Sequence, residues 1–87
     1  MKKFTQAPIG LGFHCLEHET SIAYIWNELV DKNLPPNSLW ECTPIRLHNI
    51  QWAKDGVTLL SMGAVIREGD MYKLSDWAIE KINKFLA

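Results

Sequence analysis

The sequence predicts a single small α+β domain, in which helices pack against a β-hairpin. Three observations predict this class: Gly63 stops an apolar run, two short extended segments flank a turn at 68–70, and a helical pattern follows Ser75. A chain of 87 residues has room for one domain, and its 47% hydrophobic share can fill a packed core.

The N-terminal residues 1–19 are expected to form an arm, and residues 20–87 the domain proper. Pro8, Gly10 and Gly12 interrupt any regular pattern here. We expect Leu11 and Phe13 to plug a groove of the domain.

Two helices are expected before the hairpin. Ile22, Ile25, Trp26, Leu29 and Val30 recur at helical spacing, which predicts an amphipathic helix that begins at a Thr20 or Ser21 cap, or near Leu16, and ends before two prolines. A short helical segment is expected at 39–42, a further turn is expected to open at Thr43-Pro44, and a longer helix at 47–62.

The hairpin and the last helix follow. A three-residue loop at 68–70 would pair Ile66 with Tyr72, and a two-residue loop would pair Ile66 with Lys73. The first register is preferred because it places Ala64, Ile66, Tyr72 and Leu74 on one face. Ser75 is expected to cap a helix whose buried stripe is Ala78, Ile79, Ile82, Phe85 and Leu86.

Composition narrows the class of protein. The net charge of −1 makes no general electrostatic case for nucleic acid, and two cysteines do not make a disulfide scaffold. The N-terminus is a poor signal peptide, and no apolar run approaches the ~18 residues of a membrane span. We therefore expect a soluble, cytoplasmic protein without a membrane partner.

The stretch LLSMGAVIREGDMYKLSDWAIEKI resembles the winged helix-turn-helix family. The likeness lies in a helix end of the form leucine, any, any, glycine, aliphatic, isoleucine, then a short wing, then tyrosine, any, leucine, serine or threonine. The resemblance implies a three-helix core with a β-hairpin wing and a C-terminal helix. It also implies a recognition helix before the wing that enters the DNA major groove. The DNA-binding residues that it implies are His48, Asn49, Gln51, Lys54 and Thr58 on the helix, with Arg67 and Lys73 on the wing.

Two functions follow as expectations. The first is a small transcriptional regulator that binds double-stranded DNA as a dimer, although Asp55, Glu68 and Asp70 would repel phosphate. The alternative is a non-enzymatic protein-interaction module, an inhibitor or adaptor, which binds a protein partner or a second copy. Its expected surface is Trp-rich and consists of Trp40, Trp52, Trp77, Lys81 and Lys84.

Metal binding and catalysis are the remaining alternatives. His14, Cys15, His18, Cys42 and His48 are all possible zinc ligands, and Cys15-x-x-His18 with Cys42 and His48 could complete a set of four. The preferred interpretation is two core thiols and surface imidazoles, because the paired-cysteine form of strong zinc motifs is missing. Nothing indicates an oxyanion hole or an orienting carboxylate for Cys15. We therefore expect no metal, no cofactor and no catalysis.

Overall fold

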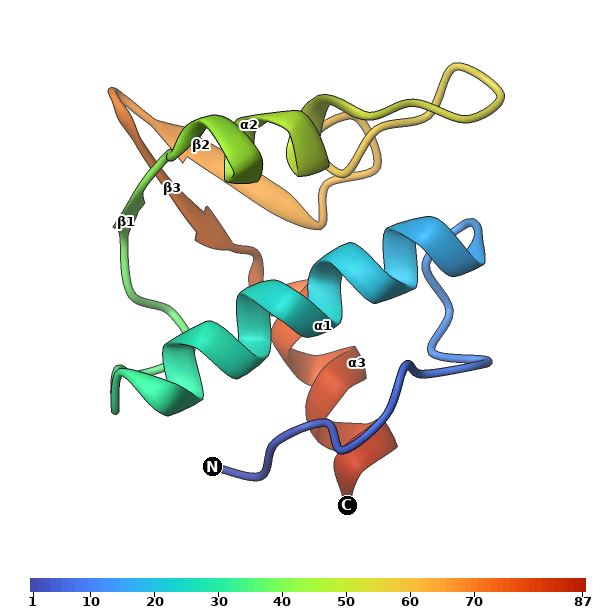
Figure 1. Ribbon diagram of the computed structural model, residues 1–87, viewed down its shortest axis with the longest axis vertical. Helices are drawn as coiled ribbons and strands as arrows, with labels where there is room; N and C mark the ends of the chain where they lie inside the picture. Colours follow the sequence, from blue (N-terminus) through green and yellow to red (C-terminus); the bar gives the residue numbers. More distant parts are fainter.

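The computed structural model describes residues 1–87, the whole chain. It is an α+β domain of three helices and one antiparallel sheet, as the sequence predicts at this level (Figure 1). None of the helices has the length and apolar composition that a membrane crossing requires. In chain order the elements are α1 (Leu16–Asp31), β1 (Trp40–Glu41), α2 (Pro44–Gln51), β2 (Val65–Glu68), β3 (Met71–Leu74) and α3 (Asp76–Leu86).

The sheet has the strand order β1-β3-β2, and both pairings are antiparallel. The prediction of a short helical segment at 39–42 is wrong, because Trp40–Glu41 form strand β1 there. In this strand Trp40 lies opposite Tyr72. The two rings stack with centroids 5.7 Å apart and planes inclined by 21°. Pairing with β3 and this aromatic contact across the strands favour the extended backbone over a helical turn.

The hairpin register differs from the preferred one. Val65 pairs with Leu74 and Ile66 with Lys73, so the loop has two residues. Gly69 opens it with φ of 61°, which suits the first position of a two-residue turn. Val65 is therefore buried at 1% exposure, whereas Ile66 is 39% exposed, which reverses the expected faces of β2.

The predicted helix at 47–62 is wrong beyond Gln51, where α2 ends. Lys54 and Val57 exchange backbone hydrogen bonds around Asp55 and Gly56, whose φ values are 56° and 76°. An Asp-Gly pair readily takes this left-handed geometry, and it turns the chain back sharply.

A single helical turn replaces the rest of that helix. The backbone N–H groups of Thr58 and Ser61 donate to each other's side-chain oxygens. Gly63, with φ of 78°, ends the turn as predicted: its N–H donates to the Leu60 carbonyl, and that of Ala64 to the Leu59 carbonyl. These are the two bonds of a Schellman motif.

α1 follows its predicted stripe and α3 follows its own in part, because Phe85, expected to be buried, is 42% exposed. α1 buries Ile22, Ile25, Trp26 and Leu29, and α3 buries Ala78 and Ile82, with the Ser75 hydroxyl accepting from the Ala78 N–H. Because α1 begins at Leu16, the expected boundary between residues 19 and 20 falls inside this helix.

The N-terminal segment contributes to the same core. Phe4, Leu11 and Phe13 are buried there, and Phe13 meets the Trp77 ring edge-on at 5.2 Å. Trp26 Nε1 donates to the Lys2 carbonyl oxygen at 2.7 Å. The segment passes beside the C-terminal part of α3 (Figure 1), where Phe4 lies 5.9 Å from Phe85. Residues 1–15 thus cover the side of α1 that faces α3.

Candidate functional site

The residues expected to bind DNA do not share one helix. His48, Asn49 and Gln51 lie in the last turns of α2, and Thr43 caps the helix start by accepting from the Arg46 N–H. Lys54 lies beyond the helix, on the turn around Asp55-Gly56, and Thr58 begins the separate single turn. The reading face implied by the resemblance is therefore divided among three segments.

The charges of the wing are largely satisfied within it. Lys73 Nζ lies 2.8 Å from Glu68 Oε1, and the hydrogen bond and charge of Glu68 raise the pKa of Lys73. Arg67 Nε donates to the Gly69 carbonyl oxygen, and its side chain has no carboxylate partner. Only Arg67 is thus left on the wing as a cation without a countercharge.

The tryptophans expected at a partner surface come from three separate elements. Trp40 stacks on Tyr72, and Trp52 meets the buried His18 ring edge-on at 5.1 Å. Trp77 is 42% exposed, and Lys81 Nζ lies 5.5 Å from its ring centroid. Lys84 pairs with Glu80 in the same helix. The rings of Trp40 and Trp52 are thus engaged inside the fold, and Trp77 with Lys81 is the open part of the set.

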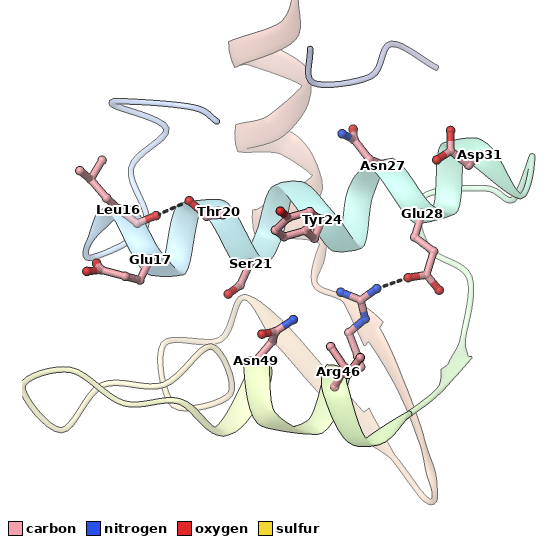
Figure 2. A pocket seen from close by; sticks show the side chains of 11 residues that line it. Leu16, Glu17, Thr20, Ser21, Tyr24, Asn27, Glu28, Asp31, Arg46 and Asn49 are labelled. Carbon is pink, nitrogen blue, oxygen red and sulfur yellow. Dashed lines mark hydrogen bonds and ion pairs between the residues drawn. The ribbon is translucent and has the colours of Figure 1, made fainter. Parts of the chain in front are cut away.

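A hollow of about 750 Å³ lies between α1 and α2, and we call it the α1–α2 groove. Figure 2 shows Arg46 and Asn49 pointing from α2 toward α1, with the Arg46 guanidinium donating to Glu28. Lys32 bonds the same carboxylate, and these two cations lower the pKa of Glu28. The groove is lined by Leu16, Glu17, Thr20, Ser21, Tyr24, Asn27, Glu28, Asp31, Ile45, Arg46 and Asn49.

A second cluster lies at the start of α1. The side-chain donor atoms of His14, Cys15 and His18 all lie within 4.8 Å of one another. His18 Nδ1 is 3.2 Å from His14 Nδ1 and also 3.2 Å from Cys15 Sγ. Cys42 and His48, which could have completed the expected set of four, are not in this cluster. We call these three residues the His-Cys cluster.

The Nε2 atoms of His14 and His18 each lie near an oxygen atom. His18 Nε2 lies 3.3 Å from the Trp52 carbonyl oxygen, and His14 Nε2 lies 3.5 Å from Asp55 Oδ2. His18 is fully buried, which contradicts its expected place on the surface. His14 has φ of 38°, and this left-handed backbone allows it to lie beside His18 one turn later.

The two thiols lie apart, Cys15 in the His-Cys cluster and Cys42 packed against the core. Both are free and half-buried. Burial raises the pKa of Cys42. A backbone hydrogen bond, followed by one from the Cys15 side chain, lowers the pKa of Glu17.

Part of the His-Cys cluster could be found from the sequence and part could not. The Cys15-x-x-His18 spacing places both side chains on one face of a helix start. No local pattern joins His18 to Trp52, because 34 residues separate them.

A scan against models of known families, a search of curated proteins and a search of solved structures each found no match for this chain.

Proposed function

We propose that the domain is a non-enzymatic protein-interaction module whose α1–α2 groove receives an apolar, cationic segment of a partner protein. One observation carries the proposal: three large apolar side chains line the groove and remain open to solvent. Leu16 is 56%, Tyr24 64% and Ile45 76% exposed. Covering exposed apolar surface of this kind is the main favourable term in association.

The charges of the groove favour a basic partner. Glu17, Glu28 and Asp31 contribute three carboxylates to its lining. Glu28 is paired with Arg46 and Lys32, and Asp31 with Lys3, so Glu17 is the carboxylate without an ion pair. Lysine or arginine beside an apolar anchor would therefore complement the rim and speed association.

The groove has hydroxyls with no imidazole or thiol beside them. Its hydroxyls belong to Thr20, Ser21 and Tyr24, and Thr20 Oγ1 donates to the Leu16 carbonyl oxygen. No imidazole or thiol among the lining residues could activate them as nucleophiles. These contacts support binding rather than catalysis.

DNA binding is the second candidate, and one observation favours it. A helix, a strand, a helix, a hairpin and a C-terminal helix follow one another as in the resemblance, although a turn stands where the recognition helix was expected to reach the hairpin. The turn after α2 and the β2–β3 hairpin project at opposite ends of α2 (Figure 1). They carry Lys54 and Arg67, exposed cations without carboxylate partners. Two free cations supply little phosphate neutralisation, so this candidate ranks second.

A peptide selection tests the groove. Random peptides displayed on phage are selected on the wild-type domain and ranked by binding to synthetic copies. We expect the enriched peptides to combine an aromatic or aliphatic anchor with lysine or arginine. Ile45→Arg should weaken them tenfold or more, because it puts a charge where an apolar contact is needed and a cation beside cationic peptide.

Ile9→Arg is the matched control, because Ile9 is 78% exposed and lies outside the groove. It should leave peptide affinity within about twofold of the wild type. Peptides that bind the Ile45→Arg and wild-type domains equally would refute the groove assignment. A random DNA duplex serves as a further arm of the same experiment. Binding at low salt that is lost in Lys54→Glu and Arg67→Glu would move the assignment to DNA.

A further inference from the structure

We propose that the His-Cys cluster is a zinc site, in which His14 Nδ1, Cys15 Sγ and His18 Nδ1 are three protein ligands of one ion. The proposal is independent of the groove and assigns a ligand to residues that the interaction role does not use. Cysteine thiolate and imidazole are the donor types that zinc prefers in proteins.

The hydrogen bonds of His18 are the first support for this zinc site. The Trp52 carbonyl oxygen 3.3 Å from His18 Nε2 can only accept, so Nε2 carries the hydrogen. In the neutral ring Nδ1 then presents a single lone pair. Two groups face that lone pair at 3.2 Å, the His14 imidazole and the Cys15 thiol. The Cys15 thiol also hydrogen-bonds Glu17, so His18 Nδ1 can accept from His14; a shared cation would instead bind all three donors.

The separations fit a tetrahedral ion. Zinc lies about 2.0–2.1 Å from nitrogen and about 2.3 Å from sulfur, so tetrahedral ligands are about 3.3–3.6 Å apart. The two separations of 3.2 Å from His18 Nδ1 are within a few tenths of an ångström of this edge. The third pair of donor atoms, from His14 and Cys15, also lies within 4.8 Å.

The surroundings of the imidazoles support the same assignment. A histidine ligand of zinc usually gives its other N–H to a carbonyl or carboxylate oxygen, which fixes the ring and its tautomer. Here the Trp52 carbonyl serves His18, and the Asp55 carboxylate lies beside His14 Nε2. The Trp52 ring packs on His18, which has no exposure to solvent. Three protein ligands leave a fourth position for water or for a carboxylate.

The ion would join distant parts of the chain. His14 and Cys15 end the N-terminal segment, His18 lies in α1, and their outer partners Trp52 and Asp55 lie on the turn after α2. That turn has only the Lys54–Val57 backbone pair of its own. A bound ion would fix this projecting turn against the start of α1.

Cobalt substitution tests the site in the full chain. Protein freed of metal by a chelator, with its thiols kept reduced, is titrated with Co²⁺. We expect one equivalent to produce a thiolate-to-cobalt charge-transfer band and the visible bands of a tetrahedral ion. Zinc should displace the cobalt and bleach both.

Single substitutions distinguish metal binding by the His-Cys cluster from binding by Cys42 or His48. Cys15→Ser should abolish the charge-transfer band, and its hydroxyl can cap α1, where Cys15 makes no capping bond. His14→Asn tolerates the left-handed backbone and should weaken binding tenfold or more. Cys42→Ser and His48→Gln should bind like the wild type. Failure of the wild type to develop the charge-transfer band, or equal cobalt binding by Cys15→Ser, would overturn the proposal.

Discussion

Val65 and Ile66 are neighbours in β2 whose side chains leave the strand on opposite faces. Val65 packs in the core with Leu74, whereas Ile66 lies opposite Lys73 and is partly open to water. Placing a charge at these two positions therefore has unequal costs. Val65→Asp buries an unpaired carboxylate and should destabilise the fold by several kcal/mol, on the order of 3 or more. Ile66→Asp should cost less than about 1.5 kcal/mol.

Urea denaturation of the two variants and the wild type, followed by circular dichroism, measures the difference in unfolding free energy. The three-residue loop expected from the sequence gives the opposite order of costs. A larger loss in Ile66→Asp than in Val65→Asp would therefore contradict the register of β2 with β3.

The same residues explain why the register was mispredicted. Alternation across two four-residue strands fits either loop length, because Ala64, Val65 and Ile66 are all apolar. Ala64 follows the Gly63 turn and is buried as well: its N–H donates to the Leu59 carbonyl, and its carbonyl accepts from the Ser75 N–H. The choice of face depends on packing against the helices, which local pattern does not contain.

At the scale of elements, the helix caps and stops that depend on neighbouring residues could be predicted from the sequence. The Ser75 cap, the helical turn that opens at Thr43-Pro44 and the Gly63 stop are confirmed, because each depends on neighbours within a few residues. The prediction of a helix at 47–62 was wrong because it relied on the helical spacing of the apolar residues and gave less weight to the Asp55-Gly56 pair, which favours a turn.

The candidate sites divide in the same way. The pair Cys15 and His18 is visible from its spacing, but the Trp52 carbonyl and the Asp55 carboxylate reach it only through the fold. The groove escaped prediction because Tyr24 and Ile45 lie on different helices, and neither belongs to an apolar stripe.

Glu28 connects α1 to α2 and gives a prediction at this scale. The hydrogen bond from Lys32 and the charge of Arg46 lower its pKa below the usual 4.5, so folding gains stability from the ionised form. That gain is full above the unfolded value and is lost as the pH falls through the lower folded value. Glu28→Gln should cost no more than about 1 kcal/mol at neutral pH, because the side chain is 47% exposed and water screens it.

Urea denaturation at neutral pH and at about pH 3 checks both parts of this prediction. The difference between Glu28→Gln and the wild type should shrink at the acid pH, because protonation of Glu28 makes the wild-type side chain more like the neutral one of the variant. Glu80→Gln is the control, since its Lys84 partner lies one turn away in α3 and connects no second element. A difference that grows at acid pH would contradict the role of the ionised carboxylate.

The whole molecule is held together partly from its N-terminal end. Residues expected to form a separate arm place Phe4, Leu11 and Phe13 in the common core, against α1 and α3. A chain of this size has little apolar surface to spare, so losing one such contact affects the entire fold. The N-terminal segment and the three helices should therefore unfold in one cooperative transition.

Phe13 tests this cooperativity, because it is 1% exposed and meets Trp77 edge-on. Phe13→Ala should cost about 3–5 kcal/mol, the usual loss for a buried phenylalanine, and Phe13→Leu should cost less. Ile9→Ala, in the same segment but 78% exposed, should change stability by no more than about 0.5 kcal/mol. Tryptophan fluorescence reports on all four tryptophans, of which Trp26 and Trp77 contact the N-terminal segment, and circular dichroism reports on the helices. If the segment is part of the core, both signals shift together to lower urea in Phe13→Leu. A fluorescence change that precedes the loss of helix, with the helix midpoint unchanged, would mean that the segment detaches as a separate arm.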